Sequence, residues 1–521
     1  MISFFPAALP LAAAFQITGS DKSFLCIGIG CYVLVMLGIG FLASGKIKTP
    51  EDYLVAGRRL PLWMATATLL ATWFGAGSSL GVTAMTYSKG ISGVLADPFG
   101  ASLCLLLAGI FIVGALRKNK CLTVTDIIST QYGSRAGIFA TLWMMPVYIG
   151  WLGSQMLGIG TILNLLTGID ILYGTLIGAA IFLIYTYAGG MWAVTLTDIV
   201  QVTLIIAGLI ILLPGTLSEA GGFEKLWSSL SKADLSFAPQ ASKGVTTLSD
   251  WSYYIGSWIV MGLGCMVGQD LIQRSLAAKD EKTAVRSSII SAFLYSFIAM
   301  IPIIIGFAAR IVLPKYGITS ETIGSNLDNQ ILPQMALIIL GKLHPLALIL
   351  FFSALISAIM SSADSCLLAG SSLFCNNILK PILPEISDKK FLLITRISTV
   401  VLLAVSLFFA MSVQNIYLLM KNSWVTQLVV VFIPVVTAIY LPKASPRAAW
   451  ASMLISLAVW LGYCGYFFIN ATGSFAEIMN NFDRPVTCGA VYGFASGAVA
   501  FFSCYAIENI SDRLKEKRKN E

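Results

Sequence analysis

The sequence predicts an all-α, polytopic membrane protein, and three observations lead to this fold class. Of the 521 residues, 57% are hydrophobic and only 11% are charged, and the mean hydropathy is +0.84. A soluble domain carries charge on roughly a quarter of its residues, so this composition excludes one. The apolar residues form runs of about 20 or more, the length that a helix needs to cross a bilayer. Basic residues gather in alternate connections between these runs.

Apolar runs of spanning length predict about thirteen transmembrane helices. They lie at 24–44, 62–88, 91–116, 137–167, 171–188, 194–217, 250–273, 286–313, 345–377, 391–413, 415–441, 447–470 and 487–507. The start of the chain, MISFFPAALPLAAAFQ, is apolar but lacks the basic flank of a signal peptide. We therefore interpret it as an external tail, with a cleaved signal as the alternative.

The distribution of lysine and arginine predicts the orientation in the membrane. An external N-terminus places 23 of the 33 basic residues in the cytoplasm and nine on the other side. The tail SDRLKEKRKNE then lies in the cytoplasm, and the bias accounts for the net charge of +8 without a nucleic-acid partner. Lys421 is left out of this tally because it falls inside a predicted helix. We expect it either to snorkel to the interface or to face a cavity.

Two of the predicted spans contain glycine-rich interruptions. The stretch ATWFGAGSS puts Gly75 and Gly77 at the middle of the span 62–88, and MGLGCMVGQD interrupts the span 250–273. Glycines also serve close helix packing, but irregular backbone at membrane depth is typical of a binding site. Two broken segments that each open a set of five helices are what an inverted repeat predicts.

The domain prediction is a single transmembrane unit with four parts. They are a tail and leading helix at 1–61, a first five-helix repeat at 62–217, a second at 250–441, and two trailing helices with a basic tail at 442–521.

The chemistry-bearing residues favour cation binding over catalysis. The ten cysteines are scattered without CxxC spacing and His344 is the only histidine, so a Cys/His metal site or a His-based catalytic site is not expected. In the span 345–377, ISAIMSSADSCLLAGSS crowds small hydroxyl residues onto one turn. The Ala358 carbonyl with the Ser361 and Ser362 hydroxyls can offer neutral oxygens to Na⁺. Serine-rich helix packing is the alternative.

Several motifs resemble those of the sodium/solute symporter family along nearly the whole chain. They are GRRLPLW before the first broken helix, GGMWAVTLTDIVQ at 189–201, GQDLIQR at 268–274 and AIMSSADS at 358–365. The pattern ATW-x-G-x-G at 71–77 is similar to that of the high-affinity choline transporter branch. The resemblance implies a leucine-transporter-like inverted repeat of five plus five helices, with sodium as the coupling ion and no cofactor.

The resemblance also implies a sodium site. Its ligands would be the carbonyls of Ala71, Phe74 and Ala358 and the hydroxyls of Ser361 and Ser362. Asp198 matches the acidic residue of the family's Thr-Asp pair and would be a station for sodium leaving to the cytoplasm. A structural alternative is that Asp198 caps the start of its helix beside Thr195 and Thr197.

The expected substrate site departs from the choline branch at one position. Trp73 and Trp151 match two of the tryptophans that hold a quaternary ammonium, but the position of a third is Gly268. The residues expected to line the site are Trp73, Gly75, Asp97, Trp151, Gly268, Gln269 and Lys421. Asp97 could pair with an amine, pair with Lys421, or cap the turn before Pro98.

Together these features predict a sodium-coupled symporter of the plasma or bacterial inner membrane that imports a small polar solute by alternating access. An amine or amino-acid-like solute is expected. Sugars, carboxylates and vitamin-type solutes remain alternatives, as does a channel of the same fold, whereas an enzyme is not expected. The oligomeric state is left open.

Overall fold

The computed structural model describes residues 19–45, 49–119, 121–239, 245–319, 328–412, 415–441, 444–473, 477–478 and 481–520. These residues are almost entirely helical, and the β-pairing found among them is one isolated bridge between Leu60 and Ala278. The prediction of an all-α protein is therefore confirmed. The expected external tail falls mainly on residues 1–18, which lie outside the described ranges.

The main helices follow the predicted order. They are α1 (Gly19–Ser44), α2 (Pro50–Val55), α3 (Leu62–Trp73), α4 (Val82–Lys89), α5 (Ala101–Ala108), α6 (Gly114–Lys118), α7 (Thr125–Tyr132), α8 (Ser134–Thr167), α9 (Ile171–Ala220), α10 (Phe223–Ser229), α11 (Leu248–Gly262), α12 (Gln269–Ala277), α13 (Glu281–Lys315), α15 (Ile331–Leu340), α16 (Pro345–Leu373), α17 (Lys380–Ile382), α18 (Asp388–Ser412), α19 (Ile416–Ser423), α20 (Phe432–Tyr440), α21 (Pro446–Ile469) and α23 (Asp483–Asn520). Short 3₁₀ or π segments, η2 to η10, join or interrupt them: η2 (Ala56–Arg58), η3 (Gly77–Gly81), η4 (Ile91–Val94), η5 (Leu95–Gly100), η6 (Gly109–Val113), η7 (Gly264–Val267), η8 (Asp328–Gln330), η9 (Phe374–Leu379) and η10 (Gln427–Val431).

The expected count of thirteen spanning helices is not confirmed. Within the described ranges, ten helices are long and apolar enough to cross a membrane, and an eleventh span is the bent pair formed by 248–267 and 269–277. The expected spans at 62–88 and 171–188 correspond to shorter apolar helices, Leu62–Trp73 with the segments after it and Ile171–Ile184. The first is interrupted after Trp73, and α9 bends at Gly190, whose φ of 50° and ψ of −162° separate the expected spans 171–188 and 194–217.

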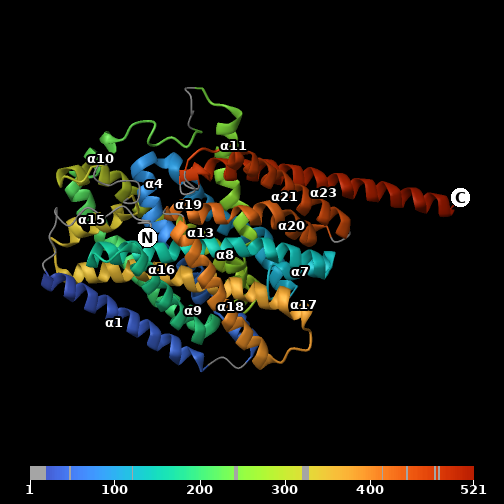
Figure 1. The fold of residues 1–521 in the computed structure, drawn as a ribbon, viewed down its shortest axis with the longest axis horizontal. Coiled ribbons are helices and arrows are strands. Elements are labelled where there is room, and N and C mark those ends of the chain that lie inside the picture. The colour runs from blue at the N-terminus through green and yellow to red at the C-terminus, as the bar shows by residue number, and fades with distance from the viewer. Residues whose placement is uncertain are drawn as a thin grey trace.

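The helices pack into one bundle around the two broken segments. α3 packs against α9 and α13, and α16 packs along α9 and α8, so that α3 and α16 meet inside the bundle. The trailing helices α21 and α23 pair with each other, and α23 extends well beyond the bundle (Figure 1). Large apolar side chains such as Phe293 and Phe297 are exposed on the outer face of α13, as expected for a surface in contact with lipid.

The first predicted interruption is confirmed. α3 ends at Trp73, where Phe74 leaves helical geometry with a φ of −95° and a ψ of 81°, and the chain resumes as the π-helical segment η3. A Cβ at Gly75 would lie 2.3 Å from Ser362 Oγ and 2.7 Å from Gln155 Oε1. Glycine is required here because it lets α16 and α8 approach the backbone of the break.

The second predicted interruption is confirmed as well. α11 ends at Gly262, the 3₁₀ segment η7 follows, and Gly268 is extended before α12 begins, with a bend of 42° between the two arms. The broken backbone remains buried, so side chains and neighbouring helices must supply its hydrogen bonds.

Candidate functional site

The two broken segments touch each other through one side-chain hydrogen bond. Trp73, the last residue of α3, donates its indole N–H to Asp270 Oδ2 at 3.0 Å, and Asp270 lies in the first turn of α12. Tyr148 of α8 completes this contact: its hydroxyl lies 3.3 Å from Asp270 Oδ1 and accepts the backbone N–H of Gln269 at 2.7 Å. The ends of both breaks are therefore joined at a buried carboxylate.

One face of α8 carries the side chains that meet the breaks. Tyr148, Trp151 and Gln155 follow one another at spacings of three and four, which puts them on one side of a helix. Gln155 Oε1 accepts the backbone N–H of Ala76 at 2.9 Å, so it satisfies a donor that the break leaves without a helical partner.

The residues predicted to bind sodium lie around the end of α3. Ser362 Oγ donates to the carbonyl of Thr72 at 2.8 Å, one residue from Trp73. Phe74 and Ala358 line the same small cavity, whose volume is about 10 Å³ and whose other walls include Ile205 and Leu209. This cavity is lined mainly by apolar side chains. It shows that the two residues face each other, and the involvement of the carbonyls of Ala71, Phe74 and Ala358 stays a prediction.

Asp198 lies beside the predicted sodium residues. Its Oδ1 accepts the hydroxyl of Ser361 at 2.5 Å and its Oδ2 accepts the hydroxyl of Thr68. The alternative in which Asp198 caps a helix start is wrong, because Asp198 lies in the middle of α9 and the Thr195 and Thr197 hydroxyls bond to carbonyls of their own helix.

Asp97 forms neither the ion pair nor the turn cap considered above. Its carboxylate accepts the Ser78 hydroxyl at 2.7 Å and the Tyr295 hydroxyl at 2.6 Å, and the side chain is fully buried. Ser78 Oγ also donates to the carbonyl of Trp73 at 2.9 Å. Asp97 therefore supports the backbone just after the first break, and whether it also meets an amine stays a prediction.

Lys421 does not snorkel to the interface. Its side chain is 3% exposed and its Nζ lies 3.1 Å from Asp483 Oδ1 in an ion pair. The same Nζ lies 3.2 Å from the Tyr253 hydroxyl and 4.4 Å from the centre of that ring. This partner, Asp483, lies on α23, a trailing helix outside both predicted repeats. The sequence offered Asp97 as a partner for Lys421 and gave no indication of Asp483.

Of the remaining predicted substrate residues, Trp151 and Gln269 bond to other partners. The Trp151 ring packs edge-on against Trp424 at 5.7 Å. Both Trp73 and Trp151 are buried, so neither faces lipid. The Gln269 amide bonds to the segment before α7: its Oε1 accepts the N–H of Val124 at 2.8 Å.

Gln427, which the sequence did not single out, lies beside the predicted residue Gly268 and next to polar groups. A Cβ on Gly268 would lie 2.8 Å from Asp270 Oδ1 and 3.6 Å from Gln427 Nε2. Gln427 is 1% exposed, and both polar atoms of its amide are buried with no hydrogen-bond partner among the described residues. Gln427 opens the π segment η10, and π segments occur frequently at functional sites. A pattern of hydrophobicity does not reveal such a segment.

Arg274, which the charge count placed in the cytoplasm, is not exposed to solvent. The side chain is fully buried, donates to the Asp270 carbonyl at 3.2 Å and to the Ser365 hydroxyl, and interacts electrostatically with Asp198, Asp270 and Asp364. The motif GQDLIQR contains both Asp270 and Arg274. Their spacing in the sequence does not show that the bend before α12 directs both side chains into the bundle.

Comparison with known proteins agrees with this geometry. Residues 53–456 match the model of the sodium:solute symporter family. The chain belongs to that family. It is 25% identical over 454 residues to the high-affinity choline transporter 1 of Caenorhabditis elegans, covering 82% of this chain and 76% of that protein. It is 26% identical over 441 residues to the sodium/pantothenate symporter of Haemophilus influenzae, covering 82% of this chain and 88% of the relative.

Two further relatives widen the comparison. The sodium/glucose cotransporter of Vibrio parahaemolyticus is 26% identical over 396 residues, with 72% of each chain covered. The solved structure of a Na⁺-coupled sialic acid symporter, substrate-bound and outward-open, matches with a TM-score of 0.73 at 20% identity and covers 94% of this chain and 97% of its own. This similarity confirms the leucine-transporter-like fold of a multi-pass membrane protein.

Proposed function

We propose that this sodium:solute symporter takes up a small amine, amino-acid-like zwitterions included, by alternating access. The observation that carries the proposal is the carboxylate of Asp270, which lies between the two broken helices and holds the Trp73 indole at 3.0 Å. A carboxylate beside an aromatic side chain is a favourable partner for an ammonium group.

The balance of buried charge supports a cationic group. Asp198 and Asp270 both interact with Arg274, a cationic side chain buried beside them. With these three groups ionised, two negative charges face one positive charge. Buried charge without compensation is costly, so the binding of Na⁺ and of an ammonium lowers the electrostatic free energy of this region.

The sodium ion is expected at the residues predicted from the family. Ser361 joins this region to Asp198, because its hydroxyl donates to that carboxylate at 2.5 Å. An ion bound near Ser361 and Ser362 therefore has Asp198 as an adjacent anionic group, which fits the proposed release route for sodium. We place the protein in the cell membrane with its N-terminus outside and its C-terminus in the cytoplasm.

A sugar or vitamin-type solute is the second candidate, and Gln427 favours it. The unpartnered amide can donate to and accept from a hydroxyl-bearing solute. Relatives of this chain include proteins named as glucose and pantothenate symporters. A channel of the same fold would conduct without saturation and without dependence on a sodium gradient.

Uptake into proteoliposomes separates these possibilities. We would measure radiolabelled choline, glycine betaine, an amino acid, glucose and pantothenate with an inward sodium gradient and with potassium replacing sodium. Saturable, sodium-driven uptake of a substrate that carries an ammonium group supports the proposal. The Asp270→Asn variant, which lacks the proposed carboxylate, should take up the same substrate with a higher half-saturation concentration. Sodium-driven uptake restricted to glucose or pantothenate would overturn the assignment of an amine, and flux that neither saturates nor responds to sodium would indicate a channel.

A further inference from the structure

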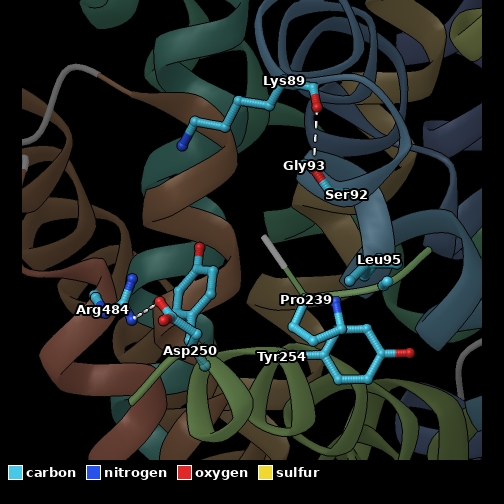
Figure 2. A pocket seen from close by; sticks show the side chains of 10 residues that line it. Lys89, Ser92, Gly93, Leu95, Pro239, Asp250, Tyr254 and Arg484 are labelled. Carbon is cyan, nitrogen blue, oxygen red and sulfur yellow. Dashed lines mark hydrogen bonds and ion pairs between the residues drawn. The ribbon is translucent and has the colours of Figure 1, made fainter. Parts of the chain in front are cut away.

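A separate pocket lies at the end of α4, away from the two breaks. Its volume is about 230 Å³, and its walls come from the end of α4, from η4 and η5, from residues 238–239, from α11 and from the start of α23. Figure 2 shows Lys89 above this space, with Arg484 and Asp250 on one side and Tyr254 with Pro239 on the other. The basic-residue distribution predicts that this side of the membrane is external.

The connection that forms one wall of the pocket is held in place. Asp234 forms an ion pair with Arg310 of α13 at 2.5 Å, and its carbonyl accepts the N–H of Ile91 at 2.9 Å. Phe237 packs edge-on against Phe99, with ring centres 4.9 Å apart. Because several contacts fix this segment, the pocket is a built cavity rather than a gap beside a loose loop.

Tyr253 lines the pocket and also contacts Lys421 of α19. The Tyr253 hydroxyl donates to Asp483 Oδ2 at 2.5 Å, and its ring lies against Lys421. The residue before Lys421, Met420, packs against Gly77 so closely that a Cβ there would lie 1.9 Å from its sulfur. The side chains of Tyr253, Lys421 and Met420 therefore connect the pocket wall to η3, next to the first break.

The pocket carries one uncompensated positive charge. Arg484 is paired with Asp250, and Lys421, which contacts Tyr253, is paired with Asp483. The Lys89 ammonium has no hydrogen bond or ion pair to any residue that the structure describes. The pocket therefore attracts a small anion, although the central region between the breaks favours a cation.

We propose that this pocket is a first binding site for the carboxylate end of the transported solute, held between Lys89 and the free donors of the Arg484 guanidinium. The inference rests on the proposed function and narrows it, because a solute with both groups is a zwitterion of the amino-acid or betaine type. Arg484 is suited to the task, since its donation to Asp250 and to Ser249 Oγ leaves further N–H groups for a second carboxylate.

The local charge can be tested without knowing the solute. A Ser92→Cys variant, made with the exposed Cys26 and Cys31 replaced by alanine, would be labelled with an anionic sulfonatoethyl and a cationic trimethylammonioethyl methanethiosulfonate. We expect the ratio of anionic to cationic rates to exceed that at Ser228→Cys, an exposed position on α10. Lys89→Gln should lower the ratio at Ser92→Cys by roughly fivefold, as an interaction of about 1 kcal/mol between partly exposed charges predicts.

Matched variants show whether the charge of Lys89 is responsible. Lys89→Arg should keep the anionic preference, and Lys225→Gln, which removes an exposed lysine on α10 outside the pocket, should leave it unchanged. An equal or cationic preference at Ser92→Cys, or a preference that survives Lys89→Gln, would overturn the proposal.

Occupancy is tested by protection of the same cysteine. Glycine betaine and choline share a trimethylammonium group, but only glycine betaine has a carboxylate; acetate and glycine extend the comparison. We expect the carboxylate-bearing probes to slow labelling in the Lys89 protein, choline to have no effect, and protection to disappear in Lys89→Gln. The absence of protection by all three carboxylates would contradict a carboxylate site.

Transport reports separately on the proposed function. Lys89→Gln should raise the half-saturation concentration for sodium-driven glycine betaine uptake and leave that for choline unchanged. If no organic solute shows sodium-driven uptake, the proposed function fails, whereas the labelling and protection results still decide the pocket. An equal effect of Lys89→Gln on the half-saturation concentrations of glycine betaine and choline would show that Lys89 does not recognise the carboxylate.

Discussion

Asp270 is the side chain at which the two broken helices meet. Its hydrogen bonds hold the carboxylate in position, and its negative charge is the feature proposed to attract a cation. The hydrogen bonds from Trp73 and Tyr148 hold the carboxylate in place, with donor–acceptor distances of 3.0 and 3.3 Å. The charge supplies attraction for a cation. A substitution that keeps the shape and removes the charge separates the two contributions.

Asp270→Asn should therefore weaken binding of an amine while the protein still folds. A hydrogen bond to a charged group contributes about 1.5–3 kcal/mol, so the half-saturation concentration for the amine should rise by roughly 10- to 100-fold. The half-saturation concentration for sodium should change much less. Trp73→Phe, which keeps a ring but loses the indole N–H, should produce a smaller increase. Unchanged amine uptake by Asp270→Asn would remove this carboxylate from the substrate site.

Ser362 tests the sodium prediction. Its hydroxyl donates to the Thr72 carbonyl, so its lone pairs remain available for an ion. Ser362→Ala should lower sodium affinity by roughly tenfold, taking about 1.5 kcal/mol for one lost ligand, and substrate saturation should largely recover at high sodium. Ser371→Ala is the matched control, since the Ser371 hydroxyl donates to carbonyls of its own helix α16. Sodium activation that is unchanged in both Ser361→Ala and Ser362→Ala would exclude these hydroxyls as ligands.

At the scale of the elements, the contact between α16 and the first break depends on the absence of a side chain at residue 75. The Cβ of an alanine would lie 2.3 Å from Ser362 Oγ and 2.9 Å from Ser362 Cβ, which is closer than real Cβ contacts occur. Either α16 moves away or the break changes shape. Both would disturb the region where sodium is expected.

Gly75→Ala should consequently abolish most sodium-driven uptake, and Ser362→Gly in the same chain should restore part of the stability by removing the contact with Ser362, while the contact at 2.7 Å with Gln155 Oε1 remains. Thermal unfolding of the purified protein measures the folding part, with Gly38→Ala as the control because nothing lies within 4 Å of a Cβ there. A stability for Gly75→Ala equal to that of the unsubstituted protein would show that the two helices are not packed as described.

The ion pair between Lys421 and Asp483 connects α19 to α23. Lys421→Met should destabilise the protein by about 3–5 kcal/mol because it leaves the Asp483 carboxylate buried beside Tyr253 without its cation. Adding Asp483→Leu should recover most of this loss, since two apolar side chains can replace a buried ion pair. Thermal unfolding measures both variants, and Lys225→Met is the exposed control. Equal stability of the single and double variants would argue against the pair.

At the scale of the whole molecule, the trailing helices are part of the bundle rather than an appendage. α23 begins with Asp483 and Arg484, which bond to residues of α19 and α11, then packs along α21 and continues beyond it (Figure 1). Because α23 contacts two elements of the second predicted repeat, its orientation also constrains theirs.

The basic-residue bias predicts this orientation, and labelling can test it. A cysteine at the exposed position 228 (Ser228→Cys) should react with a membrane-impermeant maleimide from outside. A reporter fused after Glu521 should be cytoplasmic, and Lys389→Cys, on the opposite predicted side, should react only after permeabilisation. Labelling of the C-terminal tail from outside would reject the predicted topology.

The sequence by itself determined the membrane class, the order of the helices and the positions of both breaks. Hydropathy follows from composition, and a glycine-rich interruption at membrane depth is readable because such backbone needs special partners. The motifs also singled out Asp198 and Ser361, which the structure brings into contact. The sodium and substrate sites themselves stay predictions.

Only the tertiary structure decided how the charged residues are paired. Lys421 pairs with Asp483, 62 residues away, while Arg274 and Asp270 turn inward at a bend of 42° that no local pattern specifies. Trp151 packs on Trp424, and Gln427 reaches Gly268 through a π segment. Local periodicity fixes which face of a helix is apolar, but the partner of a buried polar group depends on which helices meet, and that is decided by packing over the whole chain.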